Sequence, residues 1–136
     1  MTSDERHVLY VLGDLMSESR AFILDQGEPG LRASHHRVIG SVPPVGITQT
    51  ELADRVGMTK QGIGQFVTQL TASGHLRVEP KPGDRRVRIV HRTAKGDASV
   101  RDLSRLLDQL ESTWSERVGK ARYREFRQTL EEIALS

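Results

Sequence analysis

The N-terminal third of the chain repeats apolar residues at helical spacing. Apolar side chains recur every three or four positions from Val8 to Ile23, and the turn-forming stretch 27–30 ends this helix. A weaker helical pattern follows over residues 31–42, and the sequence Pro-Pro-Val-Gly at 43–46 then breaks the chain. Two helices are therefore predicted before residue 47.

Residues 48–74 predict two short helices joined by a tight turn. Thr48 and Glu51 have the spacing of a capping box, in which each side chain satisfies a free backbone N–H at the start of a helix. Gly57 suits the left-handed turn that ends this helix, and Thr59 can cap the next one. The apolar face of the second helix consists of Ile63, Phe66, Val67 and Leu70. This layout is typical of a DNA-binding helix-turn-helix.

A predicted hairpin follows at once. Strands are expected over residues 75–79 and 86–91, joined by the turn-forming loop 80–85. Strand, basic turn and strand directly after a helix-turn-helix predict a winged helix.

The C-terminal third predicts a long helix and a final shorter one. A helical apolar stripe begins after residue 93 and comprises Leu103, Leu106, Leu107, Leu110 and Trp114. Gly119 interrupts the pattern, and the last helix carries Tyr123, Phe126, Leu130 and Ile133. The stripe is too long for one small domain to cover, which indicates a helical seam between two copies. The expected fold is mainly α with a small β-hairpin.

Composition places the chain among small globular proteins. It has 136 residues, enough for one domain with a core, and 36% are hydrophobic and 28% charged. The absence of cysteine excludes disulfides and thiolate metal sites. The N-terminus lacks the layout of a signal peptide, and no apolar run predicts a membrane span. We therefore expect a cytoplasmic protein.

Charge is distributed unevenly along the chain. Residues 51–95 contain nine basic and four acidic groups, a net charge of +5, whereas the rest of the chain contains eleven basic and fourteen acidic groups, a net charge of −3. A basic middle between acidic ends indicates a polyanion-binding module flanked by segments with another role.

The middle of the chain resembles a known family. The sequence TQTELADRVGMTKQGIGQFVTQLTASGHLRVEPKPGDRRVRIVHRTAKG closely resembles the MarR (multiple antibiotic resistance regulator) family of bacterial transcription factors. The resemblance implies a winged helix-turn-helix region over residues 31–96. It further implies a homodimer formed by helical regions at 1–30 and 97–136. The expected partner is double-stranded DNA.

The resemblance also implies roles for the basic turn. In the family, the aspartate of the D-x-R motif orients an arginine that enters the minor groove, and the matching residues here are Asp84 and Arg86. The narrow minor groove has an enhanced negative potential that attracts arginine. Lys81 and Arg85 are expected on phosphates, and Arg88 extends the same basic surface. The alternative is an ordinary exposed ion pair, worth less than about 1 kcal/mol.

The second helix of the motif is the expected recognition helix. Its outer positions are Thr59, Lys60, Gln61, Gly64, Gln65 and Thr68. Glutamine can bond adenine in a bidentate manner, and lysine can reach guanine or phosphate. Polar residues on an outer helix face are also ordinary. Gly62 and Gly64 each cost the helix about 1 kcal/mol relative to alanine, and close approach to DNA or forgiving packing would explain them. Gly64 and Gln65 stand where the family commonly has threonine and arginine, so its operator sequences do not transfer.

Three residues of the second predicted helix lie where the family forms an effector pocket. His35, His36 and Arg37 could receive a small aromatic or anionic effector, such as an aromatic carboxylate. The alternative is a pair of solvated or core-edge histidines. No spacing of ligands predicts a metal site, and no cofactor is expected.

We expect no enzymatic activity, because the chain lacks a phosphate-binding glycine loop and the G-x-S-x-G and H-E-x-x-H motifs. The predicted function is sequence-specific regulation of transcription. It would act as a homodimeric repressor on a pseudo-palindromic operator, and a small molecule would release it. A winged-helix protein-interaction module and a non-specific architectural DNA-binding protein remain the alternatives.

Overall fold

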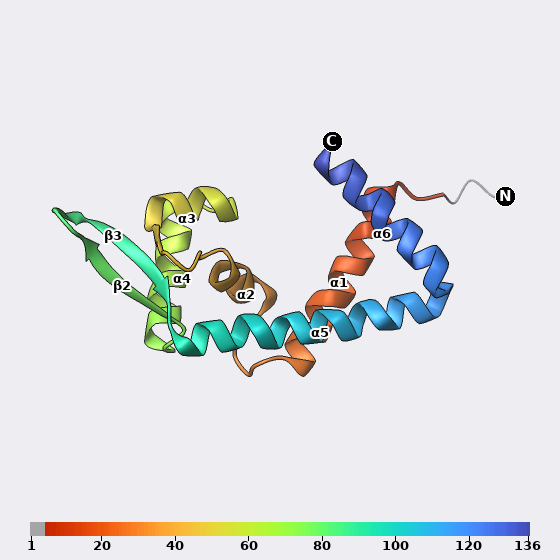
Figure 1. Cartoon of the computed structure of the whole chain (residues 1–136), viewed down its shortest axis with the longest axis horizontal. Helices are drawn as coiled ribbons and strands as arrows, with labels where there is room; N and C mark the ends of the chain where they lie inside the picture. Colours follow the sequence, from red (N-terminus) through yellow and green to blue (C-terminus); the bar gives the residue numbers. More distant parts are fainter. Residues whose placement is uncertain (1–4) are drawn as a thin grey trace.

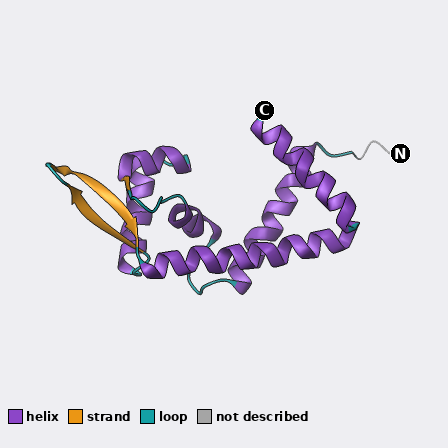
Figure 2. Ribbon diagram, viewed as in Figure 1, coloured by secondary structure: helices purple, strands orange, loops and turns teal. Residues whose placement is uncertain are grey.

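The computed structural model describes residues 5–136, so the first four residues of the predicted dimerisation region lie outside the described part. The described chain forms helices and one small sheet (Figure 2). In chain order the elements are α1 (Val8–Gln26), α2 (Ala33–Gly40), β1 (Ile47–Thr48), α3 (Gln49–Val56), α4 (Lys60–Ala72), β2 (Leu76–Lys81), β3 (Asp84–Arg92), α5 (Ala94–Val118) and α6 (Lys120–Leu135).

The long helix α5 connects two parts of the molecule. Figure 1 shows α2, α3, α4 and the sheet gathered at the N-terminal end of α5, and α1 and α6 toward its other end. The β2–β3 hairpin extends away from the helices, beyond α3 and α4. The fold therefore separates a lobe that ends in a hairpin from a pair of terminal helices.

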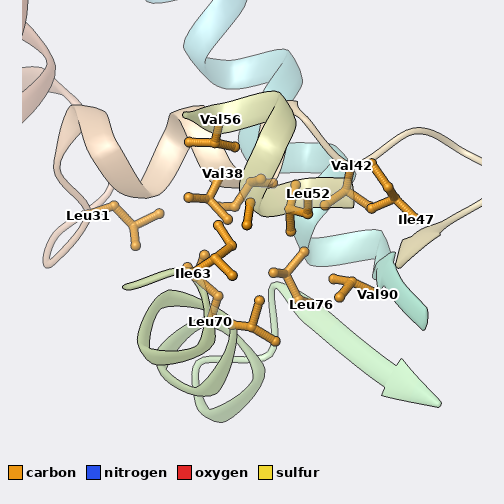
Figure 3. Close-up of a cluster of buried hydrophobic side chains, with 13 residues drawn as sticks. Leu31, Val38, Val42, Ile47, Leu52, Val56, Ile63, Leu70, Leu76 and Val90 are labelled. Atoms are coloured by element: carbon orange, nitrogen blue, oxygen red, sulfur yellow. The ribbon is translucent and has the colours of Figure 1, made fainter. Parts of the chain in front are cut away.

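The hydrophobic core lies in the hairpin lobe. Thirteen buried side chains from α2 and its flanking connections, α3, α4 and the sheet pack together, and Figure 3 shows Leu52, Ile63 and Leu76 among them. The predicted inner face of α4 is confirmed, since Ile63, Val67 and Leu70 are all buried. This core fixes α4 against α3 and against the base of the hairpin.

The sheet has one strand more than the sequence predicted. Its order is β1-β3-β2, and both pairs are antiparallel, with Ile47 and Val78 each opposite Val90. The two-residue strand β1 was not predicted because its pairing partner lies more than 40 positions away in the sequence. The predicted loop 80–85 is also mostly strand, and the hairpin turns only at Pro82 and Gly83.

The terminal helices leave much of their apolar surface uncovered. Only Ser19 and Ile23 of α1 are buried, and α6 has no buried residue. Of the predicted α5 stripe, Leu110 alone is buried. Large exposed apolar side chains on these two terminal helices are Val8, Leu9, Tyr10, Val11, Met16, Leu24, Phe126, Leu130, Ile133 and Leu135.

Two helices joined at a glycine, followed by a β-hairpin, define a winged helix-turn-helix, with α4 as the second helix and β2–β3 as the wing. The predicted fold class is confirmed. Gly57 has φ of 77° and thus supplies the left-handed residue that the turn between α3 and α4 requires.

Candidate nucleic-acid interface

The helix-turn-helix is held by caps at both helix starts. The Thr48 hydroxyl oxygen accepts the Glu51 N–H at 3.1 Å, and the Thr59 hydroxyl oxygen accepts the Gly62 N–H at 3.0 Å. Among the described residues, Glu51 forms no reciprocal bond to the Thr48 N–H, so only half of the predicted capping box is present. Both helices nevertheless start at the predicted residues.

The predicted recognition residues share the outer side of α4. Lys60, Gln61, Gln65 and Thr68 are exposed, as is the cap Thr59, whereas Gly64 is half-buried. The Thr68 hydroxyl donates to the Gly64 carbonyl at 2.9 Å, so its proton is used within the helix. The lysine and glutamine side chains are therefore the ones available to reach a partner.

A hollow of about 610 Å³ lies beside this surface. Residues of α3, α4 and β3 line it, among them Gln49, Gln61, Gly64, Gln65, Thr68 and Arg88. The recognition helix and the wing thus meet across one concave surface. A concave surface between these two elements suits a convex, negatively charged ligand such as a DNA backbone and groove edge.

The two unusual glycines of α4 have local packing reasons. A Cβ at position 62 would lie 3.1 Å from the Thr59 hydroxyl oxygen that caps the helix. A Cβ at position 64 would lie 3.2 Å from the Nε2 atom of Gln49 on α3. Both glycines are therefore closely packed within the chain, and a Cβ at either position would require the neighbouring polar atom to move by a few tenths of an ångström.

The wing presents a pre-oriented arginine. The Asp84 carboxylate accepts the Arg86 backbone N–H at 3.1 Å and the Arg86 Nε–H at 3.3 Å. The Arg86 side chain is otherwise 92% exposed, so it projects into solvent. In the described part of the chain, Lys81, Arg85 and Arg88 have no salt-bridge partner. The wing therefore carries positive charge that the chain itself does not neutralise.

The three candidate effector residues do not converge on one site. His35 is buried, and its Nδ1 accepts the Arg32 N–H at 3.0 Å. Its Nε2 lies 3.3 Å from the Gln69 amide oxygen, and its ring contacts the Phe66 ring edge-on. Arg37 is exposed. Only His36 lines a cavity. His35 thus acts as a structural residue between α2 and α4.

The cavity beside His36 has a volume of about 460 Å³ and lies between the α1–α2 connection and α5. The His36 side chain is buried, and its Nε2 atom finds no hydrogen-bond partner among the described residues. Burial lowers the pKa of His36 below its usual value, so its ring is neutral at pH 7. An unpaired buried nitrogen beside a cavity requires a physical explanation.

Glu28 is a functional candidate that the sequence reading missed. Its carboxylate lines the same cavity, accepts the Ser99 hydroxyl at 3.3 Å and lies 2.5 Å from Nε2 of His75. His75 is almost completely buried between the end of α4 and the start of β2, and its Nδ1 lies 2.6 Å from the Ser73 hydroxyl. Glu28 belongs to a predicted turn, and no local pattern connects it with a residue 47 positions away. It links the cavity to the junction of recognition helix and wing.

Residues 5–136 contain neither a metal-binding cluster nor a membrane-spanning helix. No three His, Asp or Glu side chains in this range form a group that could hold a metal ion. No helix within the same range is long and apolar enough to cross a membrane.

Fold and surface together define a winged-helix protein with a basic wing and a polar outer face on α4. Comparison with family models matches residues 30–87 to the model described as the MarR family. The likeness to this family therefore rests on the part of the chain that contains α2, α3, α4 and most of the β2–β3 hairpin. Comparison with curated protein sequences gives no match.

Solved structures of similar fold cover nearly the whole chain. The reduced form of MarR from E. coli matches 96% of this chain and 98% of its own, with a TM-score of 0.87 and 16% identity. PcaV from Streptomyces coelicolor, in complex with its natural ligand, matches 100% and 99%, with a TM-score of 0.73 and 17% identity. BpsR of Bordetella bronchiseptica, described with regulation of its DNA binding by 6-hydroxynicotinic acid, matches 95% and 99%, with a TM-score of 0.73 and 18% identity. At these identities the likeness establishes the fold.

Proposed function

We propose that this chain is a sequence-specific DNA-binding regulator of transcription that acts as a homodimer. The observation that carries the proposal is the Asp84–Arg86 pair on the wing, which holds a largely exposed guanidinium beyond the polar surface of α4. In this arrangement α4 enters a major groove while Arg86 reaches the adjacent minor groove. Lys81, Arg85 and Arg88 then contact phosphates.

In this proposal the terminal helices form the dimer interface. They correspond to residues 1–30 and 97–136, the dimerisation region predicted from the sequence. An apolar groove between α1 and α6 is lined by Leu12, Leu15, Phe126, Leu130 and Ile133, among others. Contiguous exposed apolar surface of this kind marks an interaction site. A second copy of the chain is the occupant, because a two-fold dimer presents two α4 helices to successive major grooves about 10 bp apart.

Disruption of that groove should separate the protomers. We expect the double variant Leu130→Glu, Ile133→Glu to weaken dimerisation at least about 100-fold, since two charges would have to be buried at an apolar interface. Sedimentation velocity over a range of concentrations measures this change. Gln128→Glu adds a charge at an exposed position of α6 outside the groove lining and should leave the dimer intact. Equal dimer stability in both proteins would contradict the assignment of the interface.

The test of the DNA-binding function is selection from a library of random duplexes at fixed, near-physiological salt. Specific regulators bind their sites about 10³ to 10⁷ times more tightly than random DNA. Enrichment of a palindrome is the expected result. Binding without enrichment would instead identify an architectural protein, and enrichment of acidic protein partners without DNA binding would identify an interaction module. Occlusion of a promoter by the bound dimer makes repression the expected outcome.

We further infer that the cavity beside His36 binds a small effector that regulates DNA binding. Two structurally similar proteins are described with small molecules, PcaV with its natural ligand and BpsR with 6-hydroxynicotinic acid. In this chain Glu28 lies at the cavity and also holds His75, next to the end of α4. A ligand that engages Glu28 therefore acts on the junction between recognition helix and wing.

The charges at the cavity favour a neutral or cationic effector over the anionic one expected from the sequence. The charged side chains that line it are Glu28, Asp102 and Arg105, and the last two form an ion pair with each other. Arg37, the cation of the earlier expectation, lies outside the lining. We expect benzamidine and benzamide to bind in calorimetric titrations and the isosteric anion benzoate to bind at least about tenfold more weakly.

Glu28→Gln should remove the preference for benzamidine over benzamide, because it removes the carboxylate while it keeps an acceptor oxygen for His75. Glu116→Gln, at an exposed position of α5, is the matched control. Tighter binding of benzoate than of benzamidine to the unaltered protein would contradict the charge assignment.

A further inference from the structure

We propose that Gln49, at the start of α3, is a specificity-determining residue and that the hollow it shares with α4 reads A·T base pairs. This inference rests on the proposed DNA-binding function and assigns its base preference. The observation behind it is a convergence of glutamines. Gln49, Gln61 and Gln65 all line the hollow of about 610 Å³ between α3, α4 and β3.

The three amides are uncommitted within the chain. Among the hydrogen bonds of the described residues, none involves the side chain of Gln49, Gln61 or Gln65. Gln69, on the same helix, differs because its amide oxygen pairs with the buried His35 ring. Each uncommitted amide can donate and accept at once, which matches the N6 and N7 atoms of adenine in the major groove.

Gly64 gives Gln49 its access to this surface. A Cβ at position 64 would lie only 3.2 Å from the Gln49 Nε2 atom, so the glycine leaves room for the Gln49 amide against the recognition helix. Gln61 and Gln65 are four residues apart and therefore lie on the same face of α4. A residue of the first helix thereby joins the reading surface of the second.

The helix lacks the residue that most often reads guanine. Arginine bonded to O6 and N7 of guanine is the commonest specific contact, and α4 contains no arginine. Its one cation, Lys60, lies at the first position of the helix, where phosphate contact is favoured. Arg88 also lines the hollow, but it comes from the wing strand β3 and supplies positive charge toward the backbone. Amide chemistry therefore dominates the centre of the recognition surface.

The test is selection from random duplexes with the full-length protein and three variants. The unaltered protein should enrich a palindrome in which each half-site has adenine at successive major-groove positions. Gln49→Ala should lower discrimination at one of these positions roughly tenfold, within the range for a bidentate base contact. Gly64→Ala should reduce discrimination at the same position, because the new methyl group displaces the Gln49 amide. Its fold is preserved, since alanine favours a helix more than glycine does.

Gln128→Ala, at an exposed position of α6 away from the hollow, is the control for loss of a glutamine and should leave every base preference unchanged. The proposal is overturned if the enriched half-site has G·C pairs at its centre. It is also overturned if Gln49→Ala weakens binding to all duplexes equally, because that result identifies a phosphate contact. In that case the enriched palindrome still supports the DNA-binding function. If no palindrome is enriched, the DNA-binding function fails and the base preference fails with it.

Discussion

Replacement of Arg86 by alanine should lower the affinity for the selected operator at least about 30-fold and leave the fold intact. The loss of a charged contact to DNA is worth about 1–3 kcal/mol, and a dimer loses two of them. The side chain is 92% exposed and bonds only to Asp84, so nothing in the core depends on it. Fluorescence anisotropy of a labelled duplex at several salt concentrations measures both the affinity and its salt dependence.

Arg101→Ala removes the same charge from an exposed position of α5 and serves as the matched control. Asp84→Ala should give a smaller loss than Arg86→Ala, because the guanidinium remains but is no longer held by the carboxylate. Equal affinities of the Arg86→Ala and Arg101→Ala proteins would contradict the role of the wing.

Replacement of Gly96 by alanine should lower the free energy of unfolding by about 2–3 kcal/mol, within the range for overpacking. A Cβ at position 96 would lie 2.2 Å from the backbone oxygen of His75. That oxygen cannot withdraw easily, since it accepts the Thr93 N–H at 3.1 Å. The first turn of α5 and the start of the wing would have to separate.

Denaturant unfolding followed by circular dichroism measures this effect. Gly40→Ala, at the end of α2, is the control, because a Cβ there meets nothing within 4 Å. It should leave stability unchanged or raise it slightly through helix propensity. Equal unfolding free energies for the two variants would refute the close contact between α5 and His75.

Local patterns predicted the features that depend on local physics. Helix periodicity and the caps Thr48 and Thr59 located α3 and α4 to within a residue. The T-x-K-G sequence at 93–96 also has a physical explanation. Thr93 caps α5 by accepting the Gly96 N–H, Lys95 donates to the Ser73 carbonyl at 2.7 Å, and Gly96 allows the approach of His75. These contacts hold the start of α5 against the end of α4.

Features that depend on distant pairing could not be read from the sequence. Strand β1 has only two residues and exists because Ile47 and Thr48 pair with β3. Glu28 appeared to be part of a turn, and its bond to His75 arises only when the α1–α2 connection folds against α5 and β2. The three candidate effector residues are separated for a related reason: helix geometry directs consecutive residues to different sides of α2, so only His36 lines the cavity.

The measurement that tests the central claim most directly compares two duplexes of equal length, the selected palindrome and a scrambled version, by titration at fixed near-physiological salt. We predict two protomers per palindrome and an affinity at least about 10³-fold higher than for the scrambled duplex. Equal affinity for both duplexes, or one protomer bound per palindrome, would contradict a homodimeric sequence-specific regulator.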